Sequence, residues 1–302
     1  YLGQMPDGVD LPSLIYQKRL LARGPRVVAI GGGTGLSTLL RGLKEHTSNL
    51  TAIVTVSDDG GSSGRLVRDL GVPPPGDFRS CLVALADAEP LVTELFQYRF
   101  LGNTDLAGHS FGNLFIVAMS AVTGNFETAI QESSKVLAVR GRILPSALGK
   151  VSLKAKKRDG STVYGESNIG KSSGPVEEIV IEPGYVEAYQ ESIQAVRSAE
   201  LLVIGPGSLY TSILPNLLVK GIKEAIEESS AVKIYVCNVS TQPGETDGYT
   251  LGEHVQAIAR HVGSGVLQYV LANKDIGVSL PVAWGNEVVS LEMDGVDRTE
   301  VV

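Results

Sequence analysis

The sequence has little cysteine, no long apolar run and no excess of positive charge. Cys81 and Cys237 are its two cysteines; they lie far apart without a CxxC spacing, which argues against a disulfide framework or a zinc site. The longest strongly apolar run, residues 114–122, is well short of the ~20 residues of a membrane span. With 26 Lys and Arg against 33 Asp and Glu, the chain lacks the basic surface that nucleic acids or anionic membranes require. The N-terminal residues do not resemble a secretion signal, so we expect a cytoplasmic protein.

The order of apolar segments predicts a parallel sheet. A strand at 26–30 is followed by a glycine turn, a helix with one apolar face at 36–46 and a second strand at 50–56. This order within about thirty residues is a βαβ unit. The alternation recurs between 199 and 273. We therefore expect an α/β fold, a Rossmann-like doubly wound, mostly parallel sheet with helices on both faces.

One segment departs from this alternation. Around Asp159–Gly160, a strong hairpin-turn signal, apolar and polar residues alternate, and with the strand VEEIVIE they predict a small β insertion at 150–182. The basic run at 154–158 is interpreted as a solvated face of the hairpin, with a phosphate or partner patch as the weaker alternative.

The remaining boundaries follow from the same pattern. We expect an N-terminal extension at 1–25 and a single α/β domain at 26–302 that carries the insertion. The segment 275–295, which contains Trp284, has no clear period and receives no prediction.

Four polar or glycine-rich loops follow predicted strands. They are Gly31–Gly35, Asp58–Gly64, Gly205–Ser208 and Asn238–Glu245. In a doubly wound sheet, ligands bind outside the carboxyl ends of the strands. We therefore expect the four loops to meet at one edge and to form the ligand site.

Two of the loops are glycine turns that lead into helices. GGGTGLST has Leu36 where the dinucleotide pattern GxGxxG needs glycine, and no lysine follows as in a Walker loop. Free N–H groups and the helix dipole still favour an anion there, and GPGSLYTSI repeats the arrangement. Together they indicate a diphosphate or two phosphates; the alternatives are tight turns without a ligand and Ser208 as a simple N-cap. The ligand-binding candidates in these turns are Gly31, Gly32, Gly33, Thr34, Gly35, Gly205, Gly207, Ser208 and Thr211.

The stretch SDDGGSSG places two acids beside a glycine loop. Asp58 and Asp59 would repel a phosphate at the same loop, so they are expected to meet a ribose hydroxyl, Mg²⁺ or an acceptor proton. The glycine stretch Gly60–Gly64 then serves as a flexible lid or turn without an anion. Ser62 and Ser63 in this stretch remain ligand-binding candidates.

Other polar residues complete the candidate set. Arg79 is able to clamp a carboxylate or phosphate with two hydrogen bonds, although proline-rich turns such as PPPGDFRS are usually structural. Amide and hydroxyl side chains in NVSTQPGET favour hydrogen bonds to a base, ribose or sugar over acid–base chemistry. The further binding candidates are Asp77, Arg79, His109, Asn113, Asn238, Thr241 and Gln242.

Several motifs, in order from Arg26 to about Asn273, resemble the gluconeogenesis factor family (YvcK-like proteins). They are VVAIGGGTGLSTLLRGLK, TAIVTVSDDGGSSGRL, PPPGDFRSCLVAL, LFQYRF, GHSFGNLFI, VLAVRGRILP, IGPGSLYTSILPNLLV and NVSTQPGET. The wider superfamily includes 2-phospho-L-lactate transferase (CofD), which moves a phospholactyl group from a nucleotide-diphosphate donor onto a deazaflavin precursor with Mg²⁺. The leader 1–25 and the region after Asn273 depart from the family pattern.

The resemblance implies a Rossmann-like CofD-like domain with a site for a UDP-sugar or similar nucleotide. It also implies a cytoplasmic role in carbon metabolism and in the control of cell shape and cell wall. The essential Asp-Asp pair of the transferase falls on Asp58 and Asp59, which makes them the candidate catalytic and Mg²⁺-binding residues. A homodimer and unidentified regulatory protein partners are further expectations.

Three hypotheses for function stay open. The leading one is a regulatory protein that binds a nucleotide sugar, favoured by the two glycine turns and the amide-rich rim. The second is a Mg²⁺-dependent transferase that uses a nucleotide-diphosphate donor, favoured by Asp58 and Asp59. The third, an NAD-dependent oxidoreductase, fits the fold class but lacks GxGxxG and is ranked last.

Overall fold

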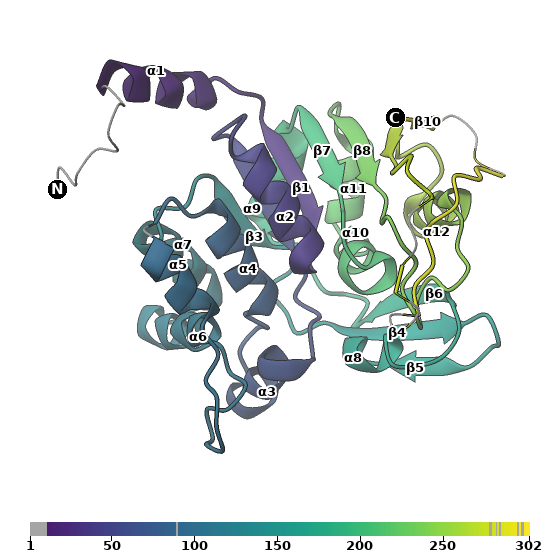
Figure 1. Ribbon diagram of the computed structural model, residues 1–302, viewed down its shortest axis with the longest axis horizontal. Helices are drawn as coiled ribbons and strands as arrows, with labels where there is room; N and C mark the ends of the chain where they lie inside the picture. Colours follow the sequence, from purple (N-terminus) through teal and green to yellow (C-terminus); the bar gives the residue numbers. More distant parts are fainter. Residues whose placement is uncertain are drawn as a thin grey trace.

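The main sheet has seven strands in the order β10-β9-β8-β7-β1-β2-β3, and all neighbouring pairs are parallel (Figure 1). The computed structural model describes residues 11–88, 90–277, 280–281, 283, 285–294, 296 and 299–302. The strands are β1 (Val27–Gly31), β2 (Leu50–Val54), β3 (Arg142–Pro145), β7 (Leu201–Ile204), β8 (Val232–Val236), β9 (Tyr269–Leu271) and β10 (Glu300–Val301). The predicted α/β class with a parallel sheet is confirmed.

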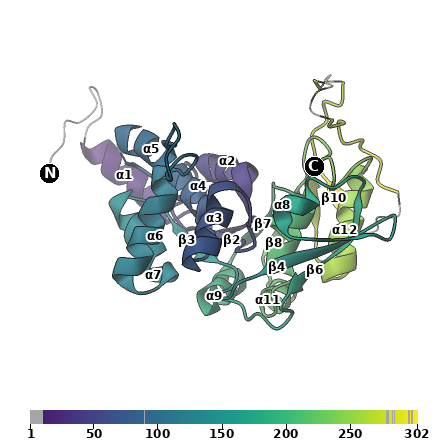
Figure 2. The same ribbon diagram turned by 90° about the horizontal axis from the view of Figure 1, so that it is seen from below.

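Helices cover both faces of this sheet, with α2 and α4 on one side and α9 and α11 on the other (Figure 2). The α-helices of the first half are α1 (Leu11–Ala22), α2 (Gly33–Leu43), α3 (Gly61–Leu70), α4 (Gly76–Leu85), α5 (Pro90–Gln97), α6 (Phe111–Thr123) and α7 (Phe126–Val136). The later ones are α8 (Glu166–Ile169), α9 (Gln190–Ser198), the π-helix η1 (Leu209–Ile213), α10 (Leu214–Leu217), α11 (Ile222–Glu228) and α12 (Leu251–Val262). Within the described residues, no helix is long and apolar enough to cross a membrane.

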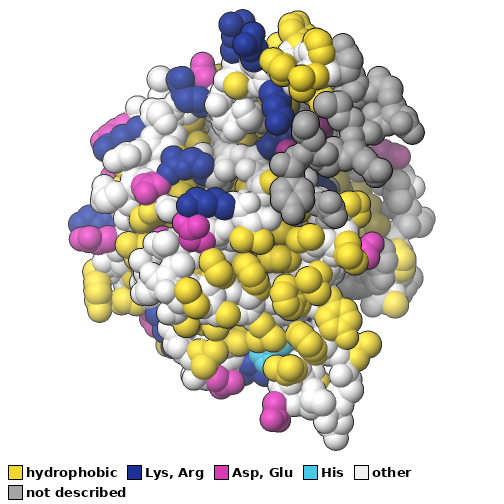
Figure 3. Space-filling view, turned by 90° about the vertical axis from the view of Figure 1, so that its left-hand side faces the viewer, with side chains coloured by type: hydrophobic (Ala, Val, Ile, Leu, Met, Phe, Trp, Pro, Cys, Tyr) yellow, Lys and Arg dark blue, Asp and Glu magenta, His cyan; other side chains and the backbone are white. Residues whose placement is uncertain are grey.

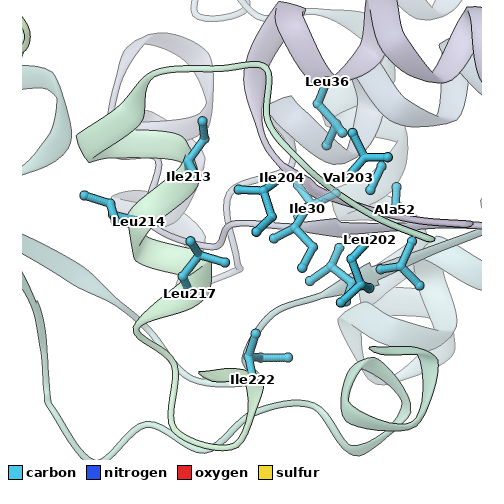
Figure 4. Close-up of a cluster of buried hydrophobic side chains, with 14 of the residues drawn as sticks. Ile30, Leu36, Ala52, Leu202, Val203, Ile204, Ile213, Leu214, Leu217 and Ile222 are labelled. Atoms are coloured by element: carbon cyan, nitrogen blue, oxygen red, sulfur yellow. The ribbon is translucent and has the colours of Figure 1, made fainter. Parts of the chain in front are cut away.

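The centre of the core lies where β1 and β7 pack against helices from both halves. Every residue of β1 and β2 is buried, as expected for strands covered on both faces. Ile30 of β1 and Ile204 of β7 lie among Leu36 of α2 and Ile213 and Leu217 of the helical turns after β7 (Figure 4). This packing fixes the positions of both glycine turns, because each turn starts directly at the end of one of these strands.

The predicted β insertion is a three-stranded antiparallel sheet of β4 (Ser152–Lys157), β5 (Thr162–Tyr164) and β6 (Val176–Glu182). Its basic run is not entirely solvated, and for Lys157 the prediction is wrong. The Lys157 side chain is buried, and its Nζ donates to the carbonyl oxygen of Gly174 at 2.9 Å and to that of Gly244. Alternation along β4 explains the difference, because every second side chain of the strand points into the molecule.

The glycine stretch after Asp59 is also different from the expected lid. Gly61–Leu70 forms helix α3, and the Gly64 N–H donates to the Gly60 carbonyl at 2.7 Å in its first turn. A Cβ atom on Gly64 would overlap the Asp59 backbone. Glycine at 64 therefore allows the first turn of α3 to lie directly against the Asp59 backbone.

The described part of the segment 275–295, whose sequence has no clear hydrophobic period, lies beside the loop after β8. Ser240 and Val288 form an antiparallel bridge there. Trp284 lies outside the described residues.

Candidate functional site

The carboxyl ends of four neighbouring strands bring the predicted loops to one edge of the sheet. β8, β7, β1 and β2 are adjacent and parallel, so the loops that follow them lie side by side. Juxtaposition of the four loops is therefore confirmed, and it creates two pockets and an acidic cluster between them.

The first pocket is a cleft of about 380 Å³ lined by the two glycine turns and the loop after β8. Its lining residues are Gly32, Gly33, Thr34, Gly35, Gly207, Ser208, Ser212, Asn238, Val239, Ser240, Gln242 and Asn286. Eight of the predicted ligand-binding residues line this pocket. Asn286, from the segment 275–295, lines it as well and was not predicted. We call this pocket the glycine cleft.

Close backbone contact between the two turns explains the glycines. A Cβ atom on Gly35 would lie 2.9 Å from the carbonyl oxygen of Pro206, and one on Gly207 would lie 3.1 Å from the carbonyl oxygen of Gly32. Gly207 also has φ of 156°, a backbone conformation that favours glycine. The N-cap of α2, Gly32, has no side chain to bond the first N–H groups of the helix. An anion in the cleft would thus meet backbone donors at the positive end of the helix dipole.

A hydrogen-bonded network fixes the rim of the glycine cleft. The Asn238 amide donates to the Gly207 carbonyl at 2.9 Å and to Gln242 Oε1 at 3.2 Å. Gln242 Nε2 donates in turn to Ser208 Oγ at 2.7 Å. These side chains are held in place before any ligand binds, which lowers the entropic cost of recognition.

Asp77 connects the glycine cleft to the acidic residues. It lies in the first turn of α4, and its carboxylate accepts a hydrogen bond from the Gly33 N–H. A Cβ atom on Gly32 would overlap Asp77 Oδ2, so a side chain at position 32 would displace the Asp77 carboxylate. Burial, with a further contribution from the Asp58 charge, raises the pKa of Asp77 to about 6.

Asp58 and Asp59 have different environments. Asp58 Oδ1 accepts from the Gly60 N–H at 2.9 Å, and Asp58 Oδ2 would lie 3.2 Å from a Cβ atom on Gly76, at the start of α4. Asp59 Oδ1 instead accepts from the Ser167 N–H at 2.8 Å. The β insertion therefore holds Asp59, whereas Asp58 faces the side of the cluster where Asp77 lies.

Two glutamates that were not among the predicted site residues enlarge the acidic cluster. Glu166, at the start of α8, has its pKa raised to about 9 by burial and then by the charges of Asp58, Asp77, Asp59 and Glu245. Its Oε2 is buried and has no hydrogen-bond partner. Burial raises the pKa of Glu245 to about 7, and Thr211 Oγ1 donates to Glu245 Oε1 at 3.1 Å. No local motif around Glu166 signals this role, because the insertion reaches the site only in the folded chain.

The second pocket, of about 230 Å³, lies on the other side of the acid pair. Asp58 and Asp59 line this pocket and not the glycine cleft. Its wall is largely apolar and consists of Val56, Val67, Val72, Pro73, Pro74, Leu148 and Val151, with Ser57, Gly71, Gly149, Lys150 and Ser152. We call it the acid-side pocket.

Several predicted site residues lie outside both pockets and make protein contacts. Ser62 Oγ is 2.9 Å from His109 Nδ1 and accepts from the Asn113 amide at 3.1 Å. Ser63 Oγ accepts from the Gly76 N–H at 3.1 Å. These bonds tie the start of α3 to the starts of α6 and α4. They hold the turn that carries the acid pair.

Arg79, Thr211 and Thr241 are also not among the lining residues of the glycine cleft. The side chain of Arg79 packs so closely against α6 that a Cβ atom on Gly112 would lie 2.8 Å from its Cγ. Thr211 is bonded to Glu245, and Thr241 Oγ1 accepts from the Glu287 N–H at 2.9 Å. Gly31 is the last residue of β1 and Gly205 directly follows β7, and neither lines the cleft.

The chain matches one known protein family over most of its length. Residues 27–298 match the family described as 2-phospho-L-lactate transferase CofD. The gluconeogenesis factor of Bacillus subtilis is 51% identical over 255 residues, which cover 84% of this chain and 80% of that protein. The chain belongs to the gluconeogenesis factor group of the CofD family. The family resemblance predicted from the sequence motifs is confirmed.

Other members of the group extend beyond this chain. A gluconeogenesis factor relative from Clostridium acetobutylicum is 53% identical over 277 residues, and the chain spans 61% of its length. Among solved structures, a UPF0052 family protein from Bacillus halodurans is 46% identical with a TM-score of 0.86, covering 92% of this chain and 93% of that one. The CofD-family fold thus accounts for nearly the whole chain.

CofD chemistry implies Mg²⁺, and the acidic cluster fits this ion only in part. Within the described part of the chain, no three His, Cys, Asp or Glu side chains stand at metal-binding spacing. Mg²⁺ is usually held by one or two carboxylates together with substrate phosphates and water, so a complete protein cage is not required. The carboxylates of Asp58 and Asp77 match this donor type, and no ion pair found among the described residues involves them.

Proposed function

We propose that this CofD-family chain binds a nucleotide sugar, of the UDP-sugar type, in the glycine cleft and acts as a regulatory protein. The observation that carries the proposal is the direct contact of two glycine turns beneath one cleft, at the start of α2. Backbone N–H groups at a helix N-terminus are suited to a diphosphate. The amide and hydroxyl groups of Asn238, Gln242 and Ser208 are suited to a base, ribose or sugar.

The regulatory role rests on the chemistry of the rim and on the relatives. Among the described residues that line the cleft, the side chains supply hydrogen bonds but no pair of groups suited to proton transfer. The B. subtilis relative is named for gluconeogenesis. We therefore infer a cytoplasmic role in carbon metabolism and in the control of cell shape and cell wall, exerted through binding.

Calorimetric titration with UDP-N-acetylglucosamine and related UDP-sugars tests this function. We expect saturable binding that is weakened at least tenfold in Gly35→Ala, because the new Cβ would press on the Pro206 carbonyl and displace the second turn. Gly42→Ala is the matched control, since it lies in the same helix and its Cβ would meet no atom within 4 Å. An absence of heat with every UDP-sugar, or equal binding by both variants, contradicts the proposal.

A second candidate function is a Mg²⁺-dependent transferase of the 2-phospho-L-lactate transferase type. The specific observation in its favour is that Asp58 and Asp59 line a separate, largely apolar pocket, while Asp77 joins them to the glycine cleft. Such an arrangement would place a donor in one pocket and an acceptor in the other. Bound Mg²⁺ would neutralise the donor phosphates, and Asp58 and Asp77 would hold it.

Release of nucleotide from a nucleotide-diphosphate donor, with Mg²⁺ and hydroxyl acceptors, tests the transferase. Asp58→Asn should abolish release, whereas Asp69→Asn, at an exposed position of α3, should leave it unchanged. Turnover that persists in Asp58→Asn would remove the acid from the reaction. Binding without turnover in the unaltered protein would favour the regulatory function.

A further inference from the structure

Two arginines from separate parts of the chain converge on the segment that leads into α6. Arg65, on α3, donates from Nη2 to the Ala107 carbonyl oxygen at 2.7 Å. Arg99, two residues after the end of α5, donates from Nη1 to the carbonyl oxygen of the next residue, Gly108, at 3.0 Å. A guanidinium group has five N–H donors, so one bond to a carbonyl oxygen leaves most of them for another partner.

A third arginine, Arg79 of α4, lies at the same end of α6. Its aliphatic part packs against Gly112, the second residue of that helix. Its Nε is buried without a hydrogen-bond partner among the described residues, and its Nη2 donates to Ser80 Oγ at a long distance of 3.4 Å. Because buried polar groups are nearly always paired, this unpaired N–H indicates a missing partner. We call the three residues, Arg65, Arg79 and Arg99, the arginine cluster.

The positive charges of the arginine cluster are not neutralised by ion pairs. No ion pair found among the described residues involves any of the three side chains. Burial, followed by the charge of Arg99, lowers the pKa of Arg79. Burial, followed by the charge of Arg65, lowers the pKa of His109, which lies in the same segment. Groups of the same sign therefore act on one another at the start of α6, a situation that an anion would relieve.

Acidic side chains do not supply that anion. The charges of Asp69 and Asp77 act on His109 and Arg79, but in each case less than the neighbouring arginine does. Glu94 and Asp105 are exposed, and no ion pair found in the described part of the chain includes them. On the side of the molecule that carries α5 and α6, a histidine lies beside Lys or Arg atoms and is surrounded by hydrophobic side chains (Figure 3). Apolar surroundings strengthen the attraction between a cation and an anion.

We propose that the arginine cluster binds the phosphate group of a small-molecule anion, at a site separate from the glycine cleft. None of the three arginines lines the glycine cleft or the acid-side pocket. Guanidinium groups pair with phosphate through two parallel N–H···O bonds, and donors from three sides suit a tetrahedral group. A bound phosphate would supply the partner that Arg79 Nε lacks. It would also offset the repulsion between Arg79 and Arg99.

Calorimetric titration with inorganic phosphate at low ionic strength tests the site. Arg65→Gln and Arg99→Gln should each weaken binding by about tenfold or more, the loss expected for one hydrogen bond between charged groups. Arg41→Gln removes the same charge at an exposed position of α2 and is the matched control, which should bind like the unaltered chain. Glycerol 3-phosphate, titrated in parallel, identifies the source of the phosphate: tighter binding than inorganic phosphate assigns the site to a phosphorylated metabolite, and weaker binding assigns it to free phosphate.

The glycine cleft is the other place where phosphate is expected to bind, and Gly35→Ala separates the two sites. If Gly35→Ala abolishes phosphate binding while Arg65→Gln and Arg99→Gln leave it unchanged, the phosphate lies in the glycine cleft and the arginine site is overturned. An unaltered chain that binds no phosphate would overturn it as well. Loss of phosphate binding in the arginine variants alone supports the arginine site, whatever the glycine cleft binds.

A second measurement uses the unaltered protein and so does not depend on the folding of variants. Phenylglyoxal modifies accessible arginine side chains, and mass spectrometry of peptides gives the rate at each position. Phosphate should slow the modification of Arg65 and Arg99 and leave that of Arg41 unchanged. Equal rates at Arg65 and Arg99 with and without phosphate would contradict the proposal.

Discussion

Replacement of Glu166 by Gln should stabilise the protein, and the gain should grow with pH. In the folded chain the pKa of Glu166 is raised from 4.5 to about 9, first by burial and then by the charges of Asp58, Asp77, Asp59 and Glu245. In the unfolded chain the carboxyl group ionises near its ordinary value. Between these two pKa values the folded state binds one more proton than the unfolded state, so a rise in pH lowers the free energy of unfolding. A glutamine side chain does not ionise, so the variant is free of this loss.

The size of the effect follows from the pKa shift. A difference of one bound proton between the folded and unfolded states changes the free energy of unfolding by about 1.4 kcal/mol per pH unit, or by about 4 kcal/mol between pH 5 and pH 8. Glu166 is half-buried, and solvent screening reduces the expected difference to about 2 kcal/mol. Glutamine has nearly the same shape as glutamate, so it removes the penalty without opening a cavity.

Urea unfolding at several pH values measures this difference. The free energy of unfolding of Glu166→Gln should be close to that of the unaltered chain at pH 5 and exceed it by about 2 kcal/mol at pH 8. Glu187→Gln, an exposed position, is the control and should show no such growth. A stability difference that is the same at pH 5 and pH 8 would refute the reasoning about the acidic cluster.

Two further predictions concern the contacts around the site. Ser62→Ala should lower the free energy of unfolding by about 1–3 kcal/mol in urea, because it leaves His109 and Asn113 without their shared partner; an unchanged stability would show that these bonds do not hold the turn. Lys157→Met should cost about 2–3 kcal/mol, since two carbonyl groups lose a buried charged donor. Lys156→Met, at an exposed position of the same strand, should change stability by less than about 0.5 kcal/mol, and equal costs for the two variants would contradict the role of burial.

Local sequence patterns were sufficient for the five inner strands of the sheet and for the glycine cleft, whereas the two edge strands, β3 and β10, were not predicted. Strand, glycine turn and helix follow one another closely in the sequence, which indicates βαβ units. The two strands of a βαβ unit are parallel and their crossover has one favoured hand, so the loops after β1, β2, β7 and β8 lie at the same edge of the sheet. The glycines at 32, 33, 35 and 207 fall in the cleft because a turn between a strand and a helix is decided by residues next to each other in the chain. The family motifs are of this local kind as well.

Tertiary structure decided the different environments of the acidic side chains. Asp59 is bonded to the insertion residue Ser167, 108 positions away, while the adjacent Asp58 faces Asp77. Glu166 reaches the cluster only because the β insertion folds back over the sheet edge. Side-chain direction and long-range packing set these contacts, and neither leaves a periodic signal in the sequence.

The same distinction applies to residues that the sequence assigned to the ligand. Thr211 has the right chemistry for phosphate binding, yet its hydroxyl donates to Glu245, and the aliphatic part of the Arg79 side chain packs against α6. The chemical type of a side chain and its position in a loop can be predicted from the sequence. Which neighbour satisfies a given side chain depends on the three-dimensional packing, because the competing partners come from segments far apart in the chain.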